Sequence, residues 1–309
     1  MRKSPVQFLA ISVLLLGCVA TGDALIDQQP APTPAPAQPL RPATGGTLPP
    51  VGKDSVKFLV IGDSGTGDRA QNEVAAQMWK SHSVFPYDFA IMLGDNMYGS
   101  ERPQDYARKF EQPFKALLDA KIEFYASLGN HDDPNQMNYK PFGMGGKRFY
   151  TFQKKDTRFF VLDSNYMDRD QQRWLEQELS QSKSKWKIAY FHHPIYSSGG
   201  RHGSEVDLRA VVEPLFIKYA LNVVFAGHEH FYERLKPQKN IYYFTAGGSA
   251  KLRAGDVQIG ALTAKAFDSD RSYMLVELDG DSLHFQVLSR AGRIVDSGTL
   301  PRQATGGTS

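Results

Sequence analysis

The chain repeats a unit of strand, turn and helix, and the first strand with its turn reads Val56-Lys57-Phe58-Leu59-Val60-Ile61-Gly62-Asp63. The apolar run predicts a buried strand, and the Gly-Asp pair predicts a turn at its carboxyl end. Residues 69–81 follow, with apolar side chains at helical spacing. Because a strand leading into a helix is the unit of a largely parallel, helix-covered sheet, we expect an α/β protein.

The alternation continues through most of the chain. Further strands are expected at residues 89–93, 122–128, 158–162, 188–191 and 221–226. Further helices are expected at residues 103–119, 168–181 and 206–219, and Pro113 should kink or split the helix that contains it. From residue 241 onward only strands are expected, at residues 241–245, 273–278, 283–288 and 293–299. These late strands predict a second, mostly antiparallel sheet packed on the first.

The first fifty residues differ in character from the rest. A basic start and an apolar run over residues 6–16 are typical of an export signal, and the run is shorter than the ~20 residues that span a bilayer. Leu15-Leu16-Gly17-Cys18 resembles a bacterial lipobox, in which Cys18 is acylated. We therefore expect a membrane-anchored lipoprotein, periplasmic or on the outer surface. The alternative is a plain signal peptide that discards Cys18, which would leave a secreted protein.

The remaining segments define the domain organisation. Eight prolines fall between residues 28 and 50, a composition typical of an extended spacer. We expect a lipoprotein-type signal peptide at residues 1–18, a Pro/Ala-rich linker at 19–53, a single folded domain at 54–301 and a flexible tail at 302–309.

The overall composition excludes several classes of protein. The chain has 309 residues, of which 41% are hydrophobic and 22% charged, as in ordinary globular proteins. Lys and Arg number 36 against 33 Asp and Glu, so we expect no nucleic-acid-binding surface and membrane contact only through the lipid anchor. The single cysteine excludes an intramolecular disulfide framework and cysteine-rich metal sites.

Polar residues that can bind metals follow five of the expected strands. They lie in the segments Gly62-Asp63, Gly94-Asp95, Gly129-Asn130-His131, Phe191-His192 and Gly227-His228-Glu229-His230. Because ligands of open α/β sheets bind at the carboxyl ends of the strands, these side chains should converge. Residues two apart in an extended segment face the same side, so His228 and His230 can both face the crevice while Glu229 faces away. Asp, Asn, His and Tyr together suit two borderline metal ions.

Five ordered blocks carry a family resemblance. They read Gly62-Asp63-Ser64-Gly65, Gly94-Asp95-Asn96-Met97-Tyr98, Gly129-Asn130-His131-Asp132, Ala189-Tyr190-Phe191-His192 and Gly227-His228-Glu229-His230. The set resembles the calcineurin-like metallophosphoesterases. With Tyr98 three residues after Asp95, the sequence resembles the purple acid phosphatase branch of this family, which includes the tartrate-resistant acid phosphatases. The resemblance extends over about residues 55–246.

The resemblance implies a fold and a metal centre. The fold would be a single-domain, four-layer α/β/β/α sandwich of two mixed sheets, with residues 54–301 as the catalytic domain. The cofactor would be a binuclear centre of Fe(III) plus a divalent iron, zinc or manganese ion. Its ligands would be Asp63, Asp95, Tyr98 and His230 for the first metal, and Asn130, His192 and His228, with Asp95 bridging, for the second. His131 and His202 match the two histidines that contact the phosphate.

The activity that the resemblance implies is acid phosphatase. A phosphate monoester would be hydrolysed by a metal-bound hydroxide, and His131 or His202 would protonate the leaving oxygen. A phosphodiesterase or nucleotide hydrolase on the same site is the alternative, followed by a non-catalytic surface lipoprotein. The segment Gly65-Thr66-Gly67-Asp68-Arg69-Ala70 also matches a dinucleotide-binding pattern. However, a dinucleotide-binding fold has a single ribose-binding acid ~20 residues further on. Here the next strand ends about thirty residues on, and it ends in Gly-Asp-Asn.

Overall fold

The computed structural model describes residues 52–303. The predicted signal peptide with Cys18, nearly all of the predicted linker, and residues 304–309 of the predicted tail lie outside the described residues. The export, lipid-anchor and domain-boundary predictions therefore stay predictions. Among residues 52–303, none of the helices combines the length and the apolar character that crossing a membrane requires.

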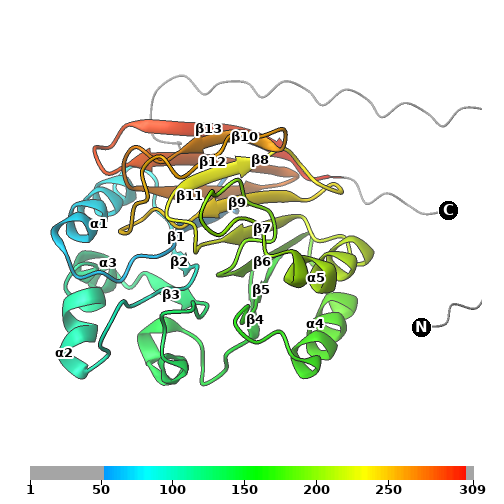
Figure 1. Ribbon diagram of the computed structural model, residues 1–309, viewed down its shortest axis with the longest axis horizontal. Helices are drawn as coiled ribbons and strands as arrows, with labels where there is room; N and C mark the ends of the chain where they lie inside the picture. Colours follow the sequence, from blue (N-terminus) through cyan, green and yellow to red (C-terminus); the bar gives the residue numbers. More distant parts are fainter. Residues whose placement is uncertain (1–51, 304–309) are drawn as a thin grey trace, which may run out of the picture. The chain divides into compact units, whose positions relative to one another are not determined.

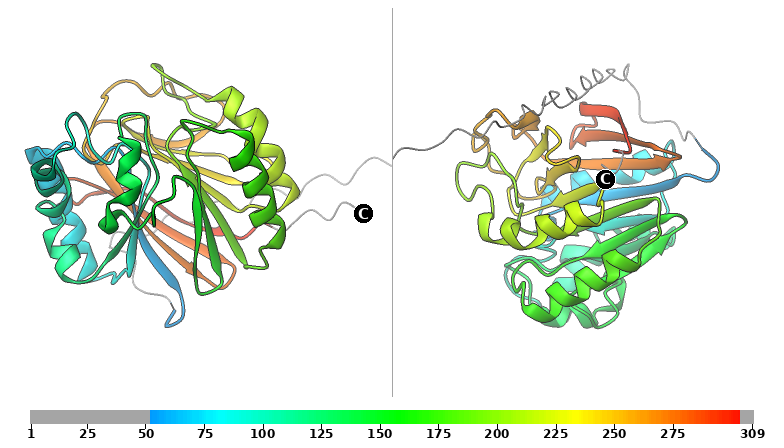
Figure 2. Two further views of the ribbon diagram at one scale, coloured as in Figure 1. Left: turned by 90° about the horizontal axis from the view of Figure 1, so that it is seen from below. Right: turned by 90° about the vertical axis from the view of Figure 1, so that its right-hand side faces the viewer.

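Two mixed β-sheets pack face to face between two layers of helices (Figures 1 and 2). The first sheet has the strand order β13 (Ile294–Pro301), β12 (Ser282–Ser289), β11 (Ser272–Asp279), β1 (Val56–Ile61), β2 (Phe89–Met92) and β3 (Glu123–Ala126). The second has the order β10 (Thr263–Phe267), β8 (Tyr232–Leu235), β9 (Tyr242–Ala246), β7 (Val223–Ala226), β6 (Trp186–Phe191), β5 (Thr157–Val161) and β4 (Tyr150–Lys154). This arrangement confirms the expected α/β/β/α sandwich of two mixed sheets.

The helices cover the outer faces of the two sheets. The first sheet is covered by α1 (Arg69–His82) and by a broken segment made of α2 (Pro103–Tyr106), the π-helical η1 (Ala107–Glu111) and α3 (Lys115–Asp119). The second sheet is covered by α4 (Arg169–Gln181) and α5 (Val206–Lys218). The break falls between Glu111 and Lys115, where Pro113 was expected to kink or split the helix.

Side-chain caps fix where two of these helices begin. The carboxylate of Asp68 accepts a hydrogen bond from the amide of Gln71 (2.9 Å), and Asp168 does the same for Gln171 (2.9 Å). Each cap satisfies one of the amides that a helix start leaves without a partner. Two short 3₁₀ turns, η2 (Pro134–Asn138) and η3 (Lys140–Phe142), complete the loop that follows β3.

The late strands do not form a sheet of their own, so that prediction was wrong. Strand β11 pairs antiparallel with β1, placing Leu278 opposite Val56, and it therefore extends the first sheet. Strand β9 instead pairs parallel with β7 in the second sheet. The sequence pattern predicts strands but not their partners, because pairing between distant segments depends on how the two sheets pack. Strands β4, β8 and β10 were not expected at all.

Aromatic side chains fix the two sheets against each other. The ring of Phe58 on β1 meets Phe225 of β7 edge to face at 6.1 Å, and Phe159 of β5 at 5.4 Å. All three are fully buried. Burial of this size is the main stabilising term of a domain core, and edge-to-face geometry adds to it. The contact sets the carboxyl ends of the parallel strands of one sheet beside those of the other.

Candidate metal centre

The seven predicted ligands come from loops that follow five strands, and the structure brings them together. Asp63 follows β1, and Asp95 and Tyr98 follow β2. Asn130 follows β3, His192 follows β6, and His228 and His230 follow β7. Parallel strands from both sheets thus deliver their ends to one place, as expected for a ligand site in an α/β protein.

One cluster gathers around Asp63. Its Oδ1 atom lies 3.3 Å from Nε2 of His230 and accepts a hydrogen bond from the hydroxyl of Tyr98 (3.0 Å). The Tyr98 hydroxyl is also 3.2 Å from Nε2 of His230. The ligand atoms of Asp63, Asp95 and His230 all lie within 4.8 Å of one another. This cluster thus contains all four residues that were expected around the first metal.

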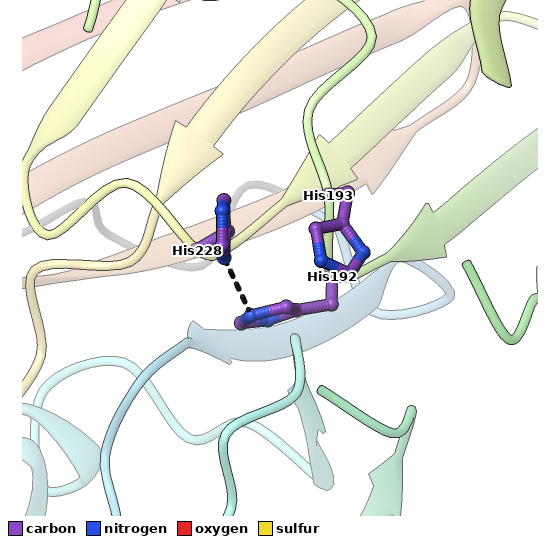
Figure 3. Close-up of side chains that lie close together, drawn as sticks. All are labelled: His192, His193 and His228. Carbon is purple, nitrogen blue, oxygen red and sulfur yellow. Dashed lines mark hydrogen bonds between the residues drawn. The ribbon is translucent and has the colours of Figure 1, made fainter. Parts of the chain in front are cut away.

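A second cluster gathers around Asn130. Its Oδ1 atom lies 3.0 Å from Nε2 of His192 and 2.9 Å from Nδ1 of His228, and those two nitrogens are 3.1 Å apart. Figure 3 shows the two imidazoles pointing toward each other from different strand ends. Asp95 Oδ1 is 3.4 Å from Nε2 of His192, so Asp95 contacts this cluster as well as the first.

The donor set fits metal cations. Ligands of a single ion at ~2.1 Å lie about 3.0–3.4 Å apart, which is the spacing seen in both clusters. Nδ1 of His192 donates to the carbonyl oxygen of Leu93 (2.9 Å), so its Nε2 presents a lone pair to the cluster. Lone pairs of an amide oxygen and imidazole nitrogens converge here, and a cation satisfies all of them.

The electrostatics lead to the same conclusion. Burial, together with repulsion from Asp95, raises the pKa of the Asp63 carboxyl well above its usual value. Burial lowers the pKa of His192 and of His228, and burial with the nearby Arg253 lowers the pKa of His230 to about 3. The imidazoles are therefore neutral ligands, and the buried carboxylates need positive charge that a metal ion would provide.

The backbone is strained at three of the ligands. Asp63, Asp95 and His228 have φ angles of 54°, 49° and 68°, in the left-handed region that residues other than glycine seldom adopt. Hydrogen bonds hold these turns: His228 N–H donates to Asp63 Oδ2 (2.9 Å) and His131 N–H donates to Asp95 Oδ1 (3.0 Å). A Cβ atom at Gly129 would overlap the amide nitrogen of Asp95, so only glycine permits this approach.

The two predicted phosphate-contacting histidines lie beside the clusters and are exposed. The His131 ring is 5.0 Å from the ring of Tyr98, and the His202 ring stacks on His228 at 4.2 Å. The loop that carries His202 is tied to Glu229, whose Oε1 accepts from Gly203 N–H (2.7 Å). Glu229 is fully buried and faces this loop, not the clusters.

Sequence reasoning missed two residues that support the site. Asp132 accepts backbone N–H bonds from Asn96, Met97 and Gly129, which joins the loops after β2 and β3. Burial and repulsion by Asp95 raise the pKa of Asp132 to about 7. Lys251 places its ammonium 4.5 Å from the Tyr98 ring centre. Asp132 belongs to the family segment Gly129-Asn130-His131-Asp132, so its position was a signal that could have been used. Nothing in the sequence singled out Lys251.

A cavity of about 620 Å³ opens beside the second cluster. Asn130 and His193 form the wall that it shares with the metal ligands, and Arg148, Tyr166 and Glu205 lie on its other sides. A ring nitrogen of His193 lies within 4.8 Å of those of His192 and His228, and Nδ1 of His193 pairs with Ser164 Oγ at 2.9 Å.

Comparison with known proteins agrees with this geometry. Residues 56–232 match the model of the calcineurin-like phosphoesterases, and the chain belongs to that family. Within the family it lies in the purple acid phosphatase branch, as Tyr98 predicted, and it is a metal-dependent phosphoesterase.

Two curated relatives and one solved structure are among the proteins that this chain resembles. Purple acid phosphatase 17 of Arabidopsis thaliana is 25% identical over 288 residues, which cover 76% of this chain and 85% of the relative. The Fe(3+)-Zn(2+) purple acid phosphatase 12 of the same plant is 43% identical over 103 residues, 31% of this chain and 22% of the relative. GAP50, the anchor in the inner membrane complex of Plasmodium, has a TM-score of 0.70 at 18% identity and shares the fold, covering 82% of this chain and 91% of its own.

Proposed function

We propose that this protein is an acid phosphatase that hydrolyses phosphate monoesters, converting an ester and water into an alcohol and inorganic phosphate. One observation carries the proposal: seven donor side chains form two clusters that share Asp95, and Tyr98 belongs to only one of them. In the resemblance stated above, that asymmetry corresponds to Fe(III) beside Tyr98 and a divalent iron, zinc or manganese ion beside Asn130. The iron–zinc name of one relative supports this pair of metals.

Bound in these clusters, two cations would offset the negative charge of the phosphate and acidify a water molecule for attack at phosphorus. The protein's own groups would do the rest. Asp95 contacts both clusters and would fix their separation. His131 and His202, on the exposed side, would contact phosphate oxygens and give a proton to the leaving alcohol oxygen.

Two alternatives have less support. Hydrolysis of diesters or nucleotides would use the same clusters, but Tyr98 favours the monoester branch. A non-catalytic role has a fold-level parallel in the Plasmodium anchor protein. All seven donor positions are filled here, however. Two of them, Asp63 and Asp95, are buried carboxylates in strained backbone, an arrangement typical of functional sites.

The test combines metal analysis with kinetics. The purified protein should contain two metal ions per chain and hydrolyse 4-nitrophenyl phosphate faster than bis(4-nitrophenyl) phosphate at acidic pH. Asp95→Asn should lower kcat by at least ~10³, because the shared carboxylate is lost. Asp119→Asn, which removes an exposed carboxylate paired with Lys115, is the control and should retain activity. Wild-type kcat in Asp95→Asn would refute the shared role, and a faster diester reaction would favour the alternative.

A further inference from the structure

The cavity beside Asn130 is well placed to receive the part of a substrate that leaves. It shares the wall formed by Asn130 and His193 with the second cluster, so a phosphate held there would direct its ester oxygen toward this space or toward bulk solvent. Its volume, about 620 Å³, lies within the range of small-molecule sites in proteins.

Hydrogen bonds make the far wall of the cavity rigid. Arg148 donates to Asp163 Oδ2 (3.0 Å) and to the carbonyl oxygen of Tyr166 (2.9 Å), and it also pairs with Asp168. Asn165 donates its backbone N–H to Asp163 Oδ1 (3.0 Å). Among the described residues that line the cavity, Arg148 carries the only guanidinium. Three of its hydrogen bonds go to the protein itself, and its charge is offset by the buried Asp163 and by Asp168.

Glu205 is the exception among the acidic residues of this wall. The carboxylate of Asp132 accepts hydrogen bonds from backbone amides, and that of Asp163 accepts one from Arg148. Glu205 precedes α5 without capping it, and no group within residues 52–303 donates a hydrogen bond to its carboxylate. Glu205 lines the cavity and lies three residues after His202, the predicted phosphate contact, in the same loop.

We propose that the cavity binds the alcohol part of the phosphate ester, and that the unpaired carboxylate of Glu205 makes it prefer alcohols that carry an ammonium group over alcohols that carry a carboxylate. The proposal rests on the proposed phosphatase function and names its substrate class: monoesters of small amino alcohols. An ammonium donates hydrogen bonds and is attracted by the charge of Glu205. A carboxylate is repelled by Glu205, and the charge of Arg148 on the cavity wall is already offset by Asp163 and Asp168.

The test uses three two-carbon monoesters that differ in charge: phosphoethanolamine, 2-hydroxyethyl phosphate and phosphoglycolate. Because their leaving groups differ in basicity, the deciding quantity is the ratio of kcat/KM for phosphoethanolamine to that for phosphoglycolate, compared between variants. Glu205→Gln should lower this ratio about tenfold, and Glu205→Lys about a hundredfold, because each step makes the charge at position 205 one unit more positive. Calorimetric binding of 2-aminoethylphosphonate and phosphonoacetate, which cannot be hydrolysed, should shift in the same direction.

Asp207→Asn provides the matched control. Asp207 is exposed in the first turn of α5, two residues from Glu205, and does not line the cavity. It should change the ratio by less than about twofold, since an exposed charge is screened. If the ratio is the same in wild type, Glu205→Gln and Glu205→Lys while 4-nitrophenyl phosphate is hydrolysed, the subsite is refuted and the phosphatase stands. If the metal-loaded protein hydrolyses none of the four esters, both proposals fall.

Discussion

The loop that carries His202 is tied at Gly203 to a buried carboxylate, and the strength of this tie can be measured. Glu229 accepts from Gly203 N–H (2.7 Å) through one oxygen and from the guanidinium of Arg253 (3.3 Å) through the other. Gly199 packs so closely on this carboxylate that a Cβ there would overlap it. Glu229→Ala removes both acceptors, so it should loosen residues 199–203 while leaving His228 and His230 in place.

The expected cost follows from these contacts. A hydrogen bond to a charged acceptor contributes ~1.5–3 kcal/mol, and a buried donor left without a partner costs a similar amount. Arg253 keeps Asp256 as a partner (3.7 Å), and burial raises the pKa of Glu229, so part of the loss is offset by not having to bury a charge. We expect Glu229→Ala to lower the free energy of unfolding by about 2 kcal/mol. For a domain of this size the melting temperature should fall by about 4–8 °C.

Three measurements at fixed metal content check the reasoning. Thermal unfolding gives the overall cost, and hydrogen exchange should show faster exchange at the Gly203 amide than in wild type. If Glu229 acts through the loop, Glu229→Ala should reduce kcat/KM in wild type but add little to His202→Ala. Glu73→Ala, which breaks solvent-screened ion pairs with Arg69 and Arg290, is the control and should lower the melting temperature clearly less than Glu229→Ala does. Unchanged exchange at Gly203 in Glu229→Ala would refute the clamp.

Three further predictions concern the metal ligands. Tyr98→Phe should abolish the visible absorption of the iron-loaded protein, because the phenolate ligand is lost. Metal analysis must show that iron is still bound to the variant. A variant that keeps its colour would exclude Tyr98 as a ligand. Gly129→Ala should lower metal affinity at least about tenfold, because the added Cβ would displace Asp95. Gly260→Ala should bind metal normally, because a Cβ there meets only the carbonyl oxygen of Gln258 at an ordinary contact distance of 3.8 Å. A metal present at a hundred times its Kd stabilises the folded state by ~2.7 kcal/mol. Removing the metals with a chelator should therefore lower the melting temperature of the wild type by about 5–11 °C. The same treatment should leave the melting temperature of Asp95→Asn nearly unchanged, and equal shifts in both proteins would contradict a shared ligand.

Strands β1 and β2 show which strands the sequence pattern predicts most directly. Strands β1 and β2 are buried along almost their whole length and read as apolar runs. Strand β8 is buried throughout although it contains Glu233 and Arg234. Glu233 accepts from Ser198 N–H (2.9 Å), and Arg234 pairs with Asp296 (2.8 Å), so their charges are satisfied by segments distant in sequence. A local pattern cannot reveal such partners, and this is why no strand was predicted at the position of β8.

The predicted ligands could be found from the local sequence pattern, whereas the residues that hold them in place could not. Asp63, Asp95 and His228 could be located because each directly follows an apolar strand, and strand ends of a parallel sheet share one crevice. Asp132 and Glu229 act on backbone amides of other loops, at Met97 and Gly203, and no spacing rule connects a carboxylate to an amide elsewhere in the chain. Yet the strained turns at the ligands persist only because such bonds hold them. Asp132, which bonds to the amides beside Asp95 and Asn130, should therefore tolerate substitution poorly although it is not itself one of the predicted metal ligands.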